Sequence, residues 1–262
     1  MKKFKFPNIR KVFKADPGHL IVDADLKGAD AQVVAAEAED EELLEAFRLG
    51  LDVHTKNAED LFGIQFLNAL PERKIYLRKK VKAGVHGTNY GGSAYALAQT
   101  LGWTVHEADK FQKRWFGLHP GILKWQKRIS ATLKAPTLRK RAIWNKFGNR
   151  KYFTDRYEEN YKQALAWVPQ STVAQLTFKA ARAVKENCGE FISSDIRYYN
   201  GFLGQVHDSL ILQIQLKHQN SLPVVLEHLN IPIPYDPPLL IPWGVKISKT
   251  SWGELTPFKL AA

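Results

Sequence analysis

Acidic residues stand where apolar, strand-like segments of this sequence end. Residues 18–26 form one such segment and carry Asp23 and Asp25 near its end, and Asp208 lies between two others. Carboxylate oxygens are the ligands that Mg²⁺ prefers. Two such ions about 4 Å apart can activate a nucleophile and hold a leaving group in phosphoryl transfer. The acids at 23 and 25 could instead cap the following helix, and Asp208 could be a turn residue. Since His-Asp-Ser is not typical of a tight hairpin turn, a functional carboxylate is favoured at Asp208.

A second group of residues with chemical potential is spaced four apart on one predicted helix: Arg78, Lys82, His86 and Tyr90. Steps of four drift by about 40° on a helix, so these side chains form one slanting stripe. Two cations and two rings suit a nucleoside triphosphate, with its phosphates on the cations. The nearby glycines suggest that something approaches the helix backbone closely (Gly84, Gly87, Gly91 and Gly92). The alternative is a solvated basic face with helix-ending glycines.

The overall charge points to a polyanionic partner. The 262 residues carry a formal net charge of +12 with a pI near 9.6, which favours nucleic acid over the alternative of a merely well-solvated basic surface. Long apolar runs of the kind that span membranes are missing, and the basic residues 1–7 precede no apolar region, so no membrane span or secretory signal is expected. Cys188 is the only cysteine, which excludes an intrachain disulfide and a cysteine-rich zinc site. We therefore expect a cytoplasmic protein, in a bacterial host if phage-encoded.

The elements that position these residues follow from hydrophobic periodicity and from capping signals. An alanine-rich helix continuing through Glu41 to Arg48 is expected after the first strand. A capping box, Thr104-Val105-His106-Glu107, starts a helix to about Phe116. The remaining predictions are helices at 52–62, 71–90, 93–101, 156–166, 170–187 and 222–229, a further helix that follows a break at 119–121 and reaches about residue 134, a hairpin at 137–153, and apolar strands at 202–206, 210–216 and 239–247. This order predicts an α/β (α+β) protein, a sheet-based domain with a helical insertion.

Several motifs, taken in order, resemble those of family A DNA polymerases, the class that includes bacterial DNA polymerase I and many phage replicases. Asp25 to Asp30 is similar to the first motif, an Asp followed five residues later by an acid. The sequence at 40–47 and 50–54, downstream of this motif, also resembles the family. Arg78-x3-Lys82-x7-Tyr90-Gly91 resembles the nucleotide-binding helix of the fingers, and Gln205-Val206-His207-Asp208 resembles the third motif.

Two further segments extend this resemblance to nearly the whole chain. Pro169-Gln170-Ser171-Thr172 is similar to the segment whose Gln reads the template–primer minor groove, and 238–252 resembles a family terminus. The resemblance implies a right-hand arrangement, with an antiparallel palm sheet and a helical fingers insertion. We expect the palm at 1–42 and 162–262 and the fingers at 43–161.

The resemblance also implies a catalytic centre for adding dNTPs to a primer 3′-hydroxyl. Asp25 and Asp208 would hold two Mg²⁺ ions, or Mn²⁺, with the backbone carbonyl of Leu26 assisting.

The other implied roles concern the nucleotide. Arg78 and Lys82 would bind the triphosphate, with His54 nearby. Tyr90 would stack under the template or nascent base pair, and Asp30 would exclude a ribose 2′-hydroxyl.

Contacts to primer–template DNA follow from the same resemblance. His207 and Gln170 would touch the primer end and the duplex. Arg141, Arg150 and Lys162 are candidate phosphate contacts, although a solvated surface role is equally compatible with each of them.

Four residues depart from the family pattern. His86 stands where Phe or Tyr is usual, and Asp30 stands where Glu is usual, so sugar discrimination is in doubt. Ser209 replaces a usual Glu and removes an accessory carboxylate, and Gly28 replaces a usual polar residue.

The first motif begins at residue 25, which leaves no room before it for a thumb or an exonuclease domain. We expect a separate polypeptide to supply these parts, or a distributive enzyme, and in either case weak, salt-dependent DNA binding.

Two rival interpretations remain at this point. A single-subunit phage-type RNA polymerase shares the two acids, the Arg-Lys-Tyr-Gly helix and a His-Asp-Ser motif. It does not share Asp30 or the sequence from Asp40 to His54. A non-catalytic DNA-binding relic of a polymerase would have no chemical need for both Asp25 and Asp208.

Overall fold

The computed structural model describes residues 7–192 and 201–258 and divides the chain into two compact units. The sheet unit comprises Met1–Ala29 and Val173–Ala262, and the helical unit comprises Asp30–Thr172. The basic residues 1–6 lie outside the described part of the chain.

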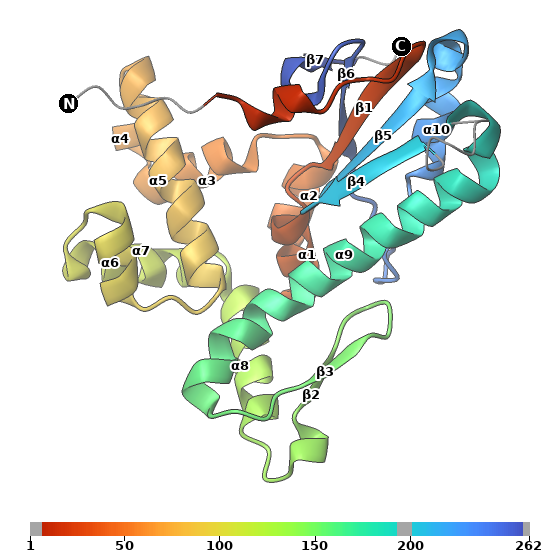
Figure 1. The fold of residues 1–262 in the computed structure, drawn as a ribbon. Helices are drawn as coiled ribbons and strands as arrows, with labels where there is room; N and C mark the ends of the chain where they lie inside the picture. Colours follow the sequence, from red (N-terminus) through yellow and green to blue (C-terminus); the bar gives the residue numbers. More distant parts are fainter. Residues whose placement is uncertain (1–6, 193–200, 259–262) are drawn as a thin grey trace. The chain divides into compact units, whose positions relative to one another are not determined.

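The sheet unit is built on one antiparallel sheet with the strand order β4-β5-β1-β6-β7 (Figure 1). Both neighbours of β1 come from the far end of the sequence, since β1 pairs with β5 and with β6. The strands are β1 (His19–Leu26), β4 (Phe202–Val206), β5 (Ser209–Gln215), β6 (Trp243–Ser248) and β7 (Thr256–Pro257). This sheet confirms the predicted α/β class with an antiparallel sheet.

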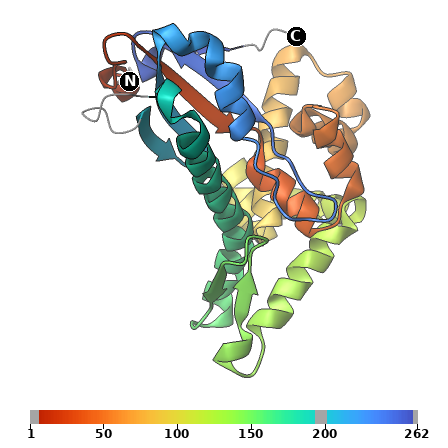
Figure 2. The ribbon, with the colours of Figure 1, turned by 90° about the vertical axis from the view of Figure 1, so that its right-hand side faces the viewer.

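The two faces of β1 have different characters because side chains alternate along a strand. Leu20, Val22 and Ala24 are fully buried and join a core with alternate residues of β5. The C-terminal part of α9 (Tyr157–Ile192) and α10 (Leu222–His228) cover this face (Figures 1 and 2). The opposite face of β1 carries Asp23 and Asp25, so the sheet turns its acids away from its apolar core.

The helical unit consists of a series of helices, a hairpin and the N-terminal part of α9, up to Thr172. Most of its predicted elements are confirmed, including the capping box at Thr104 and a left-handed C-cap at Gly102. Its elements are α1 (Ala29–Glu37, from the last residue of the sheet unit), α2 (Glu41–Arg48), α3 (Val53–Phe62), α4 (Ile64–Leu67), α5 (Pro71–Asn89), α6 (Ala94–Leu101), α7 (Val105–Leu118), α8 (Pro120–Leu133), β2 (Ala142–Trp144) and β3 (Arg150–Tyr152).

The predicted single helix through residue 48 is wrong, because the chain breaks between α1 and α2. Glu39 has a positive φ of 54°. Asp40 accepts a hydrogen bond from the Leu43 amide and another from His119 Nδ1 at 2.8 Å. A buried carboxylate needs such partners, and the break provides them.

The prediction of separate helices on either side of Pro169 is also wrong. α9 runs continuously through Pro169, although a proline inside a helix costs about 3 kcal/mol. Leu165, Val168 and Leu176 are almost fully buried, and this packing offsets the cost.

The last predicted strand begins later than expected, at Trp243 instead of residue 239. Prolines at 237, 238 and 242 lack the N–H that a sheet ladder needs. Within the described residues, no helix has both the length and the apolar character to cross a membrane.

Candidate active site

Strand pairing makes the two residues that carry the candidate metal carboxylates backbone neighbours in the sheet unit. Asp25 at the end of β1 pairs with Ser209 at the start of β5, so Asp208 is the residue next to its partner. The amide of Leu26 donates to the carbonyl of Asp208 at 3.2 Å. Neighbouring strands lie roughly 4.8 Å apart, so residues 183 positions apart in sequence become backbone neighbours. Asp25 is exposed and Asp208 is half-buried.

Asp208 lies in a tight two-residue turn between β4 and β5. Val206 pairs with Ser209, and His207 has a positive φ of 55°. The expectation that His-Asp-Ser is a poor hairpin sequence is therefore wrong, since His207 adopts the left-handed conformation that Gly or Asn usually supplies. The side chain of His207 is exposed. Asp208 is therefore a turn residue, and its expected role as a metal ligand stays a prediction.

Ser209 has a contact that sequence reasoning missed. Its hydroxyl donates a hydrogen bond to Asp25 Oδ1 at 2.7 Å. The residue that replaces an acidic side chain of the family therefore holds the Asp25 carboxylate in one orientation. No pattern in the sequence linked positions 25 and 209.

Asp23 and Asp25 have different environments although both lie on the same strand face. Asp23 is 7% exposed and accepts a hydrogen bond from Trp252 Nε1 at 2.7 Å. Neither acid stands at the residue before α1, which is Gly28, so the helix-capping alternative is wrong. Asp23 is satisfied inside the protein, and Asp25 is the acid available to a ligand.

The carboxylate pair fits divalent metal ions by its chemistry. Asp25, Asp208 and the backbone oxygens at the strand end are hard oxygen donors of the type that Mg²⁺ accepts. Among the described residues, no cluster of three or more His, Cys, Asp or Glu side chains could hold a metal alone. The remaining ligands of an ion here would have to come from backbone, water or substrate oxygens.

In the helical unit, Arg78 of the predicted stripe is held by Asp52. Arg78 Nε and Nη2 donate to the two carboxylate oxygens at 2.7 and 2.8 Å. Asp52 also caps α3, accepting from the His54 amide and from the Thr55 hydroxyl. The paired guanidinium holds the pKa of Asp52 well below its usual range. Sequence reasoning expected a helix from Asp52, but no signal indicated its bond to residue 78.

The structure places His54 close to the two candidate phosphate ligands. Burial, and then the charges of Lys82 and Arg78, lower the pKa of the His54 imidazole. Within the described residues, His54 Nδ1 is buried without a hydrogen-bond partner. A lowered pKa favours the neutral imidazole, which adds no positive charge to that of Lys82 and of Arg78, the latter being paired with Asp52.

The C-terminal end of the stripe is joined to Asp30. Tyr90 Oη donates to Asp30 Oδ2 at 2.9 Å, and burial together with this carboxylate raises the pKa of Tyr90. The His86 ring meets the Tyr90 ring edge-on, with centroids 4.5 Å apart. The residues implied in base stacking and sugar selection are therefore physically coupled.

The glycines beside the stripe leave space that other side chains of the protein fill. A Cβ at Gly84 would lie 2.8 Å from Phe111, and a Cβ at Gly91 would lie 2.9 Å from Tyr161. Gly91 also has a positive φ of 71°. The sequence correctly indicated a close approach at these two positions, and the approaching groups are side chains of α7 and α9.

The candidate DNA contacts vary in their surroundings. Gln170 and Lys162 are exposed on α9. Arg141 is half-buried and donates from Nε to the Ala135 carbonyl at 2.8 Å. Arg150 is exposed on β3, where its guanidinium lies over the rings of Trp144 and Tyr152.

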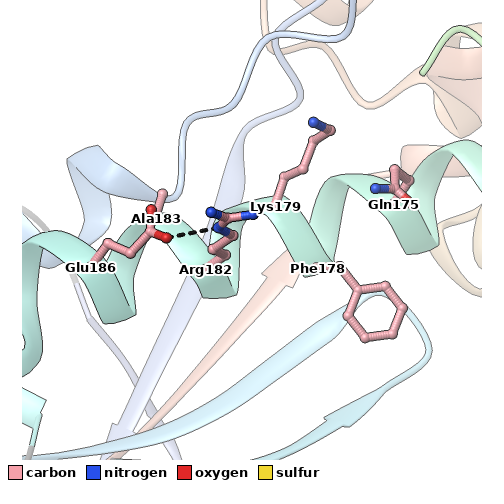
Figure 3. Close-up of a pocket in the computed structure, with 6 residues that line it drawn as sticks. All are labelled: Gln175, Phe178, Lys179, Arg182, Ala183 and Glu186. Atoms are coloured by element: carbon pink, nitrogen blue, oxygen red, sulfur yellow. Dashed lines mark hydrogen bonds and ion pairs between the residues drawn. The ribbon is translucent and has the colours of Figure 1, made fainter. Parts of the chain in front are cut away.

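A shallow groove runs along one face of α9 in the sheet unit, and none of its lining residues is a predicted site residue. Arg182 and Glu186 form an ion pair of 2.7 Å at its edge (Figure 3). The groove is lined by Gln175, Phe178, Lys179, Arg182, Ala183 and Glu186. All six belong to a single helix, so they do not enclose a ligand.

Comparison with known proteins identifies the family. A family model described as DNA polymerase family A matches residues 2–251. The chain therefore belongs to DNA polymerase family A.

Individual relatives agree with this family. The chain is 31% identical over 243 residues to DNA polymerase I of Geobacillus stearothermophilus, covering 87% of this chain and 26% of that protein. It is 27% identical over 248 residues to the DNA polymerase of Mycobacterium phage D29, covering 94% of this chain and 37% of that protein. The chain thus spans about a quarter of the length of the first relative and somewhat more of the second.

A solved structure has the same fold. The POL domain of Pol1 from M. smegmatis, in complex with DNA primer-template and dNTP, superposes with a TM-score of 0.76 at 25% identity. The match covers 94% of this chain and 42% of that chain. The predicted polymerase fold is confirmed.

Proposed function

We propose that this chain catalyses template-directed addition of dNTPs to a primer 3′-hydroxyl. The observation that carries the proposal is the pairing of β1 with β5, which sets Asp25 beside Asp208 in a chain of DNA polymerase family A. The sheet unit would be the palm and the helical unit the fingers. The boundaries between the two compact units lie at 29/30 and 172/173. The boundaries between palm and fingers that the sequence predicted, at 42/43 and 161/162, stay a prediction.

The reaction is attack of the primer 3′-oxygen on the α-phosphorus of a dNTP, with pyrophosphate as the leaving group. Asp25 and Asp208, with the Leu26 carbonyl, would hold two divalent metal ions, Mg²⁺ or Mn²⁺. Such ions lower the pKa of the attacking hydroxyl and neutralise charge on the transferring phosphate. Ser209 keeps the Asp25 carboxylate oriented for this task through its hydrogen bond.

The helical unit would supply the nucleotide contacts. Arg78 and Lys82 would bind the triphosphate, and the neutral ring of His54 would lie beside them. Asp52 occupies Nε and Nη2 of Arg78, which leaves Nη1 and the second Nη2 proton to donate to a phosphate. Tyr90 would support the nascent base pair.

Sugar selection would depend on Asp30 and His86. The Tyr90 hydroxyl holds the Asp30 carboxylate in place, so that a 2′-hydroxyl would meet a fixed group. His207 and Gln170 would contact the primer end and the duplex, and Arg141, Arg150 and Lys162 would contact phosphates.

The predicted separate polypeptide with a thumb or an exonuclease finds no support in the comparisons and stays a prediction. DNA binding by this chain alone should be weak and steeply salt-dependent if no thumb is present. Tight, processive synthesis by this chain alone at moderate salt would contradict that expectation.

The test is primer extension on a short templated duplex with Mg²⁺ at low salt, run with dNTPs and separately with rNTPs. Asp25→Asn and Asp208→Asn should each reduce extension about a thousandfold, because metal stabilisation is worth several kcal/mol. Asp23→Asn is the matched control, since an amide oxygen still accepts from Trp252 and Asp25 is untouched. Equal loss in all three variants would contradict the assignment, and preference for rNTPs would favour an RNA polymerase. DNA binding without any extension by the unmodified chain would favour a non-catalytic role.

A further inference from the structure

The hairpin formed by β2 and β3 displays an aromatic and cationic surface, of which the roles above cover only Arg150, as a phosphate contact, and neither aromatic ring. Trp144 pairs with Arg150, and Ala142 pairs with Tyr152. Paired residues, and residues two apart on a strand, share a face. We call Trp144, Arg150 and Tyr152 the hairpin face.

The hairpin face is open to solvent while the other side of the hairpin is anchored. Trp144 is 55% exposed and Tyr152 is 42% exposed. On the anchored side, Ile143 and Phe153 are buried, and β2 contacts α8 (Figure 1). The surface is therefore presented by a fixed element.

The three side chains of the hairpin face form a stack. The Arg150 guanidinium lies 5.2 Å from the centre of the Trp144 ring and 5.3 Å from that of the Tyr152 ring. Hydrogen bonds also hold the turn between β2 and β3, because Asn145 Oδ1 accepts from the amides of Phe147 and Asn149. The flat groups of the face are thus held close together before any ligand binds.

The surrounding charge has a single sign. Residues 134–154 contain no acidic side chain. Besides Arg150 they include the basic residues Lys134, Arg139, Lys140, Arg141, Lys146 and Lys151. Such a segment repels a basic partner and attracts a polyanion.

We propose that the hairpin face binds unpaired DNA, with bases stacking on Trp144 and Tyr152 and phosphates on Arg150 and its basic neighbours. Exposed aromatic rings within a cationic surface are the means by which proteins bind single strands without sequence preference. Paired bases inside a duplex offer no free faces to such rings, so single strands should be preferred. The natural ligand in a template-directed reaction would be the unpaired template. The inference does not depend on Asp25 or Asp208, since binding can be measured without metal or nucleotide.

The experiment measures binding of the full chain to a fluorescein-labelled oligothymidine of about 16 nucleotides, and to a duplex of equal length, by anisotropy in EDTA. Trp144→Ala should weaken single-strand binding by about 5- to 150-fold, the range of one base–aromatic stack, with a much smaller effect on the duplex. Trp144→Phe should restore most of the affinity. Tyr95→Ala is the matched control, because Tyr95 is an aromatic residue of α6 that is 65% exposed, and it should bind like the unmodified chain.

Salt dependence separates stacking from charge. Arg150→Ala should lower the slope of log K against log salt by about 0.7, the value for one phosphate contact on a single strand. Trp144→Ala should lower affinity without changing this slope. Unchanged binding by Trp144→Ala, equal losses on single strands and duplex, or an equal loss in Tyr95→Ala would each overturn the proposal.

Discussion

Gly91, at the C-terminal end of the predicted nucleotide-binding helix, tests whether packing of the helical unit depends on the absence of a side chain. An alanine there would keep the left-handed φ of 71° and place its Cβ 2.9 Å from Tyr161 Cε1 and 3.0 Å from Leu165 Cδ1. Leu165 is fully buried, and the Tyr161 ring stacks on Tyr157 with centroids 5.4 Å apart. Neither neighbour can move away without disturbing others.

The expected cost of Gly91→Ala has two parts. A left-handed alanine costs about 1–2 kcal/mol, and overpacking in a filled interior costs typically 1–3 kcal/mol. A control separates them, because Gly148 has a φ of 85° and nothing within 4 Å of its Cβ position. The smaller entropy of the unfolded alanine chain affects both variants alike. The difference between Gly91→Ala and Gly148→Ala should therefore be about 1–3 kcal/mol.

The assay is urea unfolding followed by circular dichroism, with the free energies of unfolding compared at equal slope. Gly148→Ala should lose at most about 1–2 kcal/mol, and Gly91→Ala should lose clearly more. Equal losses would refute the argument, since they would mean that Tyr161 and Leu165 yield to the added methyl group without cost.

Two further predictions concern polar anchors of the helical unit. Burial raises the pKa of Asp40, but hydrogen bonds from His119 and from the Leu43 amide outweigh it and hold the pKa below 3.8. The stability contributed by Asp40 is then present above the unfolded-state pKa and is lost as the pH falls through the lower folded-state pKa. Asp40→Asn should cost roughly 1.5–3 kcal/mol at pH 7 and flatten the acid limb of a stability–pH curve, and an unchanged limb would contradict this. Asp52→Ala should cost about 1–2 kcal/mol through the lost cap of α3 and the ion pair with Arg78. Asp52→Asn, which retains the cap, should cost less than 1 kcal/mol in the same urea assay, and equal costs would show that the cap contributes nothing.

Local signals in the sequence predicted most of the helices and strands, because the interactions that start and end them join residues near each other in the chain. The capping box at Thr104, the glycine that ends α6 and the apolar run before Asp25 act within a few residues. The prediction failed at Pro169 and at His207. There, burial of the surrounding helix and closure of a tight turn outweighed the usual preferences of the residues.

The sequence alone determined which residue types stand at the strand ends and along α5, and hence the family and the chemistry that Asp25, Asp208, Arg78 and Lys82 suit. Only the tertiary structure decided that Asp25 is exposed while Asp23 is bonded to Trp252. It also decided that Ser209 holds Asp25 and that Asp52 holds Arg78. The physical reason is that such contacts join positions far apart in the chain, and a single sequence contains no local signal for a hydrogen bond that forms only after β1 pairs with β5 or α3 packs on α5.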